Sequence, residues 1–119
     1  MDGRYVLVIE RDWRMRKLIR VNLEALGLRV REAVSGQHGL GLLGEGMPDL
    51  ILLDLDLPDV DAGQLFELLR SRIAERQLAI IVLSAEPPGG RWQAVRYLQK
   101  PFAVPALLRQ VRQALGNVR

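Results

Sequence analysis

The sequence contains no cysteine, so it forms no disulfide framework and has no thiolate for catalysis or metal binding. It also lacks any apolar run approaching the roughly 20 residues that cross a bilayer. The opening residues, Met1-Asp2-Gly3-Arg4, are not followed by the apolar core and small-residue cleavage site of a signal peptide. We therefore expect a cytoplasmic protein that has no membrane partner.

Lysine is scarce, and acidic residues are missing from the C-terminal part. Of the 17 basic residues only Lys17 and Lys100 are lysine, and no acidic residue follows Glu86. A basic end attracts nucleic acid, an anionic membrane or an acidic protein, but it is also the ordinary solvated face of a helix in an arginine-rich chain. We favour the solvated face. The basic residues in question are Arg91, Arg96, Lys100, Arg109, Arg112 and Arg119.

What the sequence does contain is typical of an ordinary globular protein. Its 119 residues are 49% hydrophobic and 26% charged, which argues against disorder. No internal repeat, linker or low-complexity tract appears. We therefore interpret residues 1–119 as a single domain with enough chain to bury a core.

Strand-like and helix-like segments alternate along the chain. Short apolar runs predict five strands, at about 5–9, 28–34, 50–53, 79–83 and 95–99. Helical spacing predicts helices at about 13–26, from Ser35 to about Leu43, at 62–73 and at 105–115. Asp12 and Ser35 are expected to cap the first two helices, and Gly27 to end the first. Gly39 and Gly41 should weaken the second helix, because each interior glycine costs roughly 1 kcal/mol relative to alanine.

This alternation predicts an α/β fold with a parallel sheet. Ligands of such sheets bind at the carboxyl ends of the strands, so the residues found there matter most. The first strand ends in Glu10-Arg11-Asp12, the third in Asp54 and the fourth in Ser84, and Lys100 follows the fifth. Carboxylates, a hydroxyl and an ammonium group gathered at one edge suit phosphoryl transfer to a carboxylate, with Mg²⁺ held by oxygen ligands.

Three segments in order resemble a known family. The run 54–61 (DLDLPDVD) is similar to the phosphoacceptor segment of response-regulator receiver domains in two-component signal transduction. The run 81–85 (IVLSA) is similar to the family's Ser/Thr-Ala switch segment, and 97–102 (YLQKPF) to its closing aromatic-x-x-Lys-Pro-Phe segment. The resemblance covers essentially the whole chain. It implies a flavodoxin-like, doubly wound five-stranded parallel sheet of order 2-1-3-4-5, with helices on both faces.

The resemblance also implies roles for individual residues. Asp54 would be the phosphoacceptor, Ser84 would bind a phosphoryl oxygen and act as a switch, and Lys100 would pair with the phosphoryl group or with Asp54. Tyr97 would be the aromatic switch on the output face. The Lys100–Pro101 bond is expected to be cis.

The metal site departs from the family pattern. The resemblance implies Mg²⁺ held by Glu10, by Asp54 and by the backbone carbonyl of Asp56. Where the family usually has a second acidic residue as a direct ligand, this chain has Arg11. Losing a carboxylate and gaining a cation should weaken Mg²⁺ binding or abolish it. Arg11 is free to pair with Asp54 or a phosphoryl group instead, and Asp12 is more suited to capping the helix than to replacing the ligand.

The segment between Ser84 and Lys100 is shorter than in the family. Pro87-Pro88-Gly89-Gly90 fills much of it, so the fourth helix should be short or missing. We expect Trp92 to replace some of the lost core. Because that helix belongs to the usual switching and dimerisation surface of the family, we expect the switch to differ as well. A smaller departure is Ala62, which stands where the family prefers glycine.

Two functions remain open. The first is a signalling receiver that takes a phosphoryl group from a histidine kinase or phosphotransfer protein and acts on an effector domain or partner protein. Its chemistry would be at most autocatalysis of phosphorylation and dephosphorylation. The second is an atypical receiver that works as a phosphorylation-independent interaction module. A homodimer is compatible with both.

Two further functions are disfavoured. Asp54-Leu55-Asp56 also resembles the nucleophile motif of haloacid-dehalogenase-type phosphatases, but these need another acidic cluster after the lysine, and none follows Glu86. Nucleic-acid binding by this domain has only the basic C-terminal third in its favour, without a recognisable binding motif. His38, the only histidine, has no partner motif.

Overall fold

The computed structural model describes residues 4–75 and 77–116. Five parallel strands form one sheet in the order β2-β1-β3-β4-β5. This confirms the expected flavodoxin-like order. The strands are β1 (Tyr5–Ile9), β2 (Arg29–Ala33), β3 (Leu50–Asp54), β4 (Ala79–Ser84) and β5 (Arg96–Gln99).

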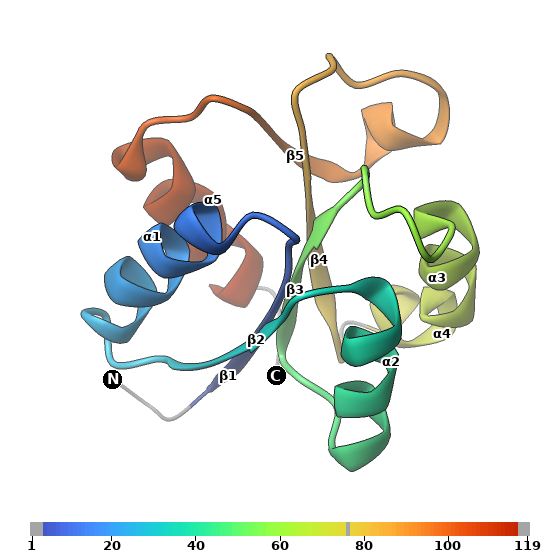
Figure 1. The fold of residues 1–119 in the computed structure, drawn as a ribbon, viewed down its shortest axis with the longest axis horizontal. Coiled ribbons are helices and arrows are strands. Elements are labelled where there is room, and N and C mark those ends of the chain that lie inside the picture. The colour runs from blue at the N-terminus through green and yellow to red at the C-terminus, as the bar shows by residue number, and fades with distance from the viewer. Residues whose placement is uncertain (1–3, 76, 117–119) are drawn as a thin grey trace.

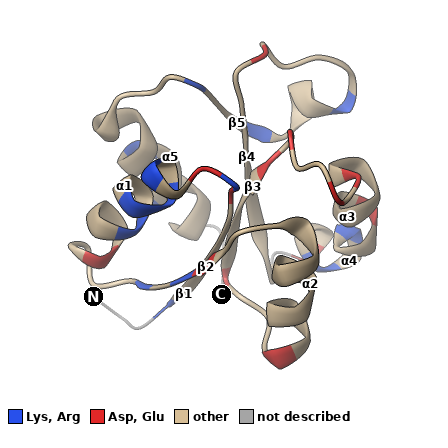
Figure 2. Ribbon diagram, in the orientation of Figure 1, with Lys and Arg blue, Asp and Glu red and all other residues tan. Residues whose placement is uncertain are grey.

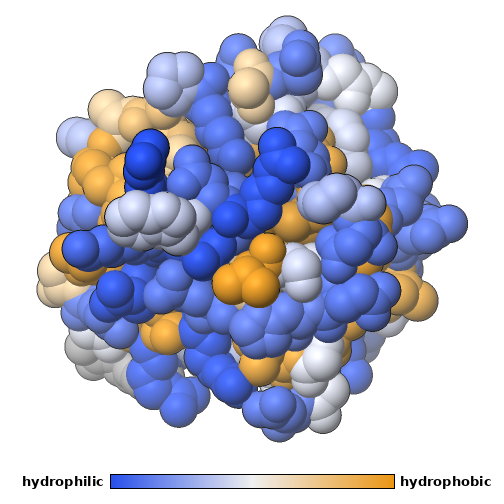
Figure 3. Space-filling view, in the orientation of Figure 1, coloured by the Kyte–Doolittle hydropathy of each residue, from blue (hydrophilic) through white to orange (hydrophobic). Residues whose placement is uncertain are grey.

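Helices cover both faces of the sheet, so the architecture has three layers (Figure 1). One face carries α1 (Trp13–Glu24) and α5 (Val104–Gly116). The other carries α2 (Gly36–Glu45), α3 (Ala62–Leu68) and α4 (Arg70–Ala74). Each face has its own apolar core, and alternate residues of β1 and β3 point into the two cores. On the outer face seen in Figure 3, apolar groups are small and scattered among hydrophilic ones.

The central strand β3 fixes the position of the functional edge. All five of its residues are buried, as expected for a strand with neighbours on both sides and helices on both faces. Ile9 of β1 pairs with Leu53, and Asp54 pairs with Leu83 of β4. The carboxyl ends of β1, β3 and β4 therefore lie at one level of the same edge.

The helix starts follow the sequence closely. Asp12 and Ser35 cap α1 and α2 through their side chains, as expected. The first helix is shorter than expected, because it ends at Glu24 and Gly27 takes a positive φ of 85° in the turn that follows. The buried residues of this helix are Ile19 and Leu23, whereas Leu18 is exposed.

The expected single helix over 62–73 is interrupted. Leu69 has ψ near 0°, and its amide donates to the carbonyl of Phe66 three residues back, which tightens the turn and separates α3 from α4. Leu69 is buried, whereas the preceding Leu68 is 73% exposed. Helical spacing located the segment correctly but could not reveal this local tightening.

Between β4 and β5 only one short 3-10 helix forms, η1 (Gly90–Ala94). This confirms the expectation that the fourth helix of the family is short or missing. Trp92 packs edge-on against Phe66, with ring centroids 5.6 Å apart, and so covers the core beside α3. The Lys100–Pro101 bond is cis, as expected. In the described part of the chain, no helix is both long and apolar enough to cross a membrane.

Candidate functional site

Buried polar side chains gather at the carboxyl edge of the sheet. Within the described residues, the buried polar or charged side chains are Glu10, Asp54 and Ser84, which are 0%, 1% and 2% exposed. They stand at or just after the ends of β1, β3 and β4. Burying such groups is unfavourable unless they are paired, and perturbed ionisable groups concentrate at functional sites. This edge is therefore the candidate site.

Glu10 is held by two contacts. Its Oε2 accepts a hydrogen bond of 3.0 Å from the amide of Asp12, and its Oε1 lies 2.6 Å from Nζ of Lys100. Burial raises the pKa of the Glu10 carboxyl, and the ammonium group of Lys100 acts in the opposite direction. The carboxylate is thus kept in place by an ion pair formed within the chain.

Asp54 lies beside this ion pair. Nζ of Lys100 is 3.7 Å from its Oδ1, which also accepts a hydrogen bond of 2.9 Å from the amide of Asp56. The amide of Lys100 in turn donates to the carbonyl of Ser84 at 2.8 Å. One cation therefore serves two carboxylates and lies closer to Glu10 than to Asp54. Figure 2 shows acidic and basic segments meeting at this end of β1, β3 and β5.

A chain of hydrogen bonds connects Ser84 with Tyr97. Oγ of Ser84 accepts from the amide of Glu86 at 3.1 Å, and the hydroxyl of the half-buried Tyr97 donates to the carbonyl of Glu86 at 2.7 Å. A hollow of about 480 Å³ borders both side chains and extends to Asp56 and Trp92. The two residues expected to act as switches are therefore joined through one residue, Glu86, of the loop after β4.

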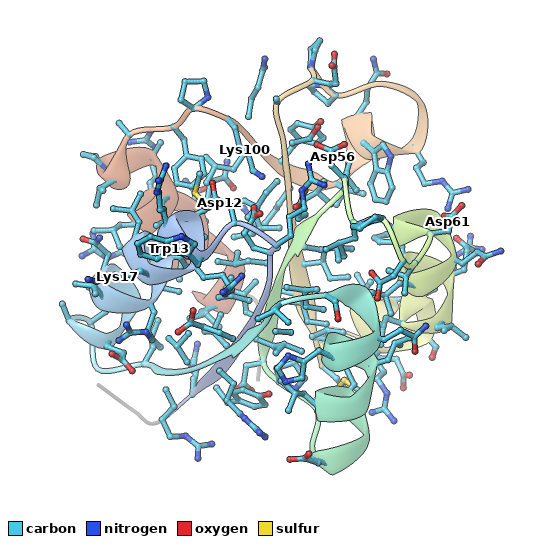
Figure 4. All side chains as sticks on the ribbon, in the orientation of Figure 1. Asp12, Trp13, Lys17, Asp56, Asp61 and Lys100 are labelled. Atoms are coloured by element: carbon cyan, nitrogen blue, oxygen red, sulfur yellow. The ribbon has the colours of Figure 1, made fainter. Side chains whose placement is uncertain are left out.

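The loop after β1 carries two further predicted residues. Asp12 accepts the amide of Arg14 at 2.9 Å, so its carboxylate is engaged at the start of α1. Arg11 is exposed, and its guanidinium makes no hydrogen bond or ion pair with any of the residues described. In Figure 4, Asp12 and Lys100 approach the site from the α1 and α5 side, and Asp56 from the loop after β3.

The donors at this edge do not make a complete magnesium site. They are the carboxylates of Glu10 and Asp54 and the backbone carbonyl of Asp56, and both carboxylates already share Lys100. Throughout the described ranges, no three acidic, histidine or cysteine side chains are grouped so as to hold a metal ion. Mg²⁺ demands near-octahedral oxygen ligands. The residues present therefore fit this ion poorly.

One positioning residue was missed at the sequence level. Nη1 of Arg16 donates to the carbonyls of Glu10 at 2.7 Å and Arg11 at 3.0 Å, while its Nε contacts Glu32 of β2 at 3.2 Å. Arg16 thus ties the loop after β1 to α1 and β2. The available signal was a cation near the N-terminus of a helix, where the helix dipole disfavours positive charge.

A family comparison agrees with this geometry. The model of the response regulator receiver domain matches residues 6–112. The chain therefore belongs to the receiver-domain family of two-component signalling. Domains of this family generally accept a phosphoryl group and use Mg²⁺ to do so.

Some curated relatives are about twice as long as this chain, and others have a similar length. The KDP operon transcriptional regulatory protein KdpE of Escherichia coli is 38% identical over 116 residues, which cover 92% of this chain and 50% of KdpE. The DNA-binding dual master transcriptional regulator RpaA of Synechocystis is 35% identical, with coverages of 92% and 48%. The chain thus spans about half the length of these relatives. By contrast, it covers 96% of the polar-differentiation response regulator DivK of Brucella ovis, which is 30% identical.

Solved structures show the same fold. The receiver domain of the Francisella response regulator 1452 superposes with a TM-score of 0.80 at 25% identity, covering 96% of this chain and 98% of that one. The chemotaxis response regulator CheY4 of Vibrio cholerae gives a TM-score of 0.82 at 23% identity, with coverages of 95% and 99%. The likeness to CheY4 supports the fold alone.

Proposed function

We propose that this receiver domain accepts a phosphoryl group on Asp54 from the phosphohistidine of a histidine kinase or phosphotransfer protein. The observation that carries the proposal is the place of Asp54: a buried carboxylate that ends the central strand, 3.7 Å from the ammonium group of Lys100. A carboxylate nucleophile beside a fixed cation is suited to phosphoryl transfer, in which positioning and charge neutralisation do most of the work.

The surrounding residues take the roles that the chemistry requires. Lys100 neutralises charge on the incoming phosphoryl group, and the hydroxyl of Ser84 is free to donate to one of its oxygens while Oγ keeps the amide of Glu86. Glu10, Asp54 and the carbonyl of Asp56 are the groups that would hold Mg²⁺. Because Arg11 replaces the second acidic ligand, they would hold it weakly at most.

Phosphorylation of Asp54 would be transmitted to the protein surface through the loop after β4. A phosphoryl group that accepts from the hydroxyl of Ser84 would draw this side chain toward it. Because Oγ of Ser84 also accepts from the amide of Glu86, and the carbonyl of Glu86 accepts from the hydroxyl of Tyr97, the shift would pass along the loop to Tyr97. The face around Tyr97 would then act on an effector domain or partner protein, or on a second copy of the chain. The named roles of KdpE and RpaA in transcription suggest an effector of that kind. We place residues 1–119, as one receiver domain, in the cytoplasm, and assign no nucleic-acid contact to them.

The test is the intact mass of the protein after incubation with a small phosphodonor and Mg²⁺. We expect the wild type to gain one phosphoryl group and Asp54→Asn to gain none. Asp61→Asn is the matched control: Asp61 is an exposed acid in the same loop that caps α3, and asparagine caps a helix equally well. This variant should keep the adduct. An adduct that survives in Asp54→Asn would contradict the assignment.

The second candidate function is a phosphorylation-independent interaction module. Two observations favour it: Lys100 lies closer to Glu10 than to Asp54, and the donor set is incomplete for Mg²⁺. Absence of an adduct from wild-type protein that is shown to be folded would select this function over the first.

A further inference from the structure

Arg11 follows Glu10 in the loop after β1, and its side chain has no partner among the residues that the structure describes. Its backbone carbonyl is fixed by Arg16 at 3.0 Å, yet its exposed guanidinium contacts no carboxylate among the described residues. Other arginines nearby are engaged: Arg16 and Arg20 pair with Glu32, and Arg14 lies over the ring of Trp13 at 5.6 Å. A rigid backbone that carries an uncommitted guanidinium is a feature suited to binding an anion.

The register of the sheet brings Arg11 within reach of Asp54. Ile9 pairs with Leu53, so Glu10 stands level with Asp54 and Arg11 lies one residue beyond. Neighbouring strands are about 4.8 Å apart. An extended arginine side chain spans more than this distance, so the guanidinium of Arg11 is able to reach a phosphoryl group attached to the Asp54 carboxylate.

The charges at the edge require such a cation. Glu10 and Asp54 share the single charge of Lys100. A phosphoryl group brings up to about two negative charges. In the described chain no cluster of three ligating side chains is available to bring a divalent ion. Among the residues that the structure describes, Arg11 is the cation after β1 whose side chain has no carboxylate partner.

We propose that Arg11 supplies, from within the chain, the positive charge that binds the phosphoryl oxygens, so that phosphorylation of Asp54 does not depend on a divalent metal. The inference rests on the proposed function and specifies how its site works. A guanidinium offers two parallel N–H donors to two phosphoryl oxygens, a geometry that a lysine does not reproduce.

The reaction is an ordinary displacement at phosphorus. An oxygen of the Asp54 carboxylate forms a bond to the phosphorus of a phosphoramidate-type donor, and the phosphorus–nitrogen bond breaks. The electron pair leaves with the nitrogen, which takes a proton from solvent. Arg11 and Lys100 bind the phosphoryl oxygens, and neither gains nor loses a proton.

The experiment measures the rate of adduct formation by intact mass, using phosphoramidate with either EDTA or Mg²⁺. Four proteins are compared: wild type, Arg11→Ala, Arg11→Asp and the control Arg14→Ala, each checked for folding by circular dichroism. We expect the wild type and Arg14→Ala to react at similar rates in both buffers. Arg11→Ala should be slower by about tenfold or more, a modest value for loss of one preorganised donor group. Arg11→Asp, which restores the missing carboxylate, should react only with Mg²⁺.

The possible failures are distinguishable. A wild-type adduct that forms with Mg²⁺ but not with EDTA, or an Arg11→Ala variant as fast as the wild type, overturns this inference and leaves the proposed function intact. Absence of any wild-type adduct in both buffers overturns the two together.

Discussion

At the scale of single residues, the site can be located because the fold buries few polar side chains and these lie together. Glu10, Asp54 and Ser84 are those groups in the described chain, and Lys100 contacts two of them. Glu10 has an unusual pKa, because burial raises it even though Nζ of Lys100 lies 2.6 Å from its carboxylate. The ionised form of Glu10 is therefore less favourable in the folded protein than in the unfolded chain, because the cost of desolvation exceeds the gain from Lys100.

This raised pKa predicts a pH dependence of stability. Between the ordinary value of 4.5 and the higher folded value, the folded protein binds more protons at Glu10 than the unfolded chain does. The contribution of Glu10 to the free energy of unfolding is therefore full below pH 4.5 and is lost as the pH rises through the folded pKa. Glu10→Gln removes this titration. Urea denaturation at a series of pH values should show the wild type losing stability relative to Glu10→Gln as the pH rises. If the wild type instead gains stability relative to Glu10→Gln over this range, the pairing with Lys100 outweighs burial.

Several residues of the candidate site could be predicted from the sequence, because of where they stand relative to the strands. Asp54, Ser84 and Lys100 follow apolar runs, and parallel strands bring such positions to one edge. The division of Lys100 between two carboxylates could not be found in this way, because it depends on distances set by the longer side chain of Glu10. Arg16 was missed because its position near a helix N-terminus is only a weak signal, and the two backbone carbonyls that it binds cannot be identified from the sequence.

At the scale of elements, α2 shows that glycines of one helix serve different purposes. The sequence predicted a weak helix from Ser35 to about Leu43, and α2 is ten residues long. A Cβ atom on Gly39 would lie 2.6 Å from Cδ1 of the buried Ile9, so this glycine allows the helix to approach β1 closely. A Cβ atom on Gly41 would have no neighbour within 4 Å. Helix propensity alone could not separate the two positions.

The two glycines therefore predict opposite effects of the same substitution. Gly39→Ala should destabilise the protein by about 1–3 kcal/mol, as overpacking of a core does. Gly41→Ala is the matched control and should stabilise it by about 0.5–1 kcal/mol, because alanine favours the helix. Thermal or chemical denaturation measures both. Equal effects at the two sites would contradict the close approach of α2 to β1.

At the scale of the whole molecule, the fold class followed from alternating strands and helices, whereas the strand order followed from the resemblance to receiver domains. The structure and the family match confirm both. The reduced connection between β4 and β5 was also foreseen, because proline and glycine fill a short segment. In this connection Glu86 joins Ser84 at the site to Tyr97 on the neighbouring strand, and we propose that a signal would follow this link.

The most direct test of the central claim, that phosphorylation of Asp54 changes this domain, is the backbone amide NMR spectrum of nitrogen-15-labelled protein before and after addition of a small phosphodonor. Wild type and Asp54→Asn are recorded under the same conditions. We predict that signals of Asp54, Ser84, Glu86 and Tyr97 move in the wild type and stay in place in the variant. A wild-type spectrum that does not change, or one that changes equally in Asp54→Asn, would contradict the claim.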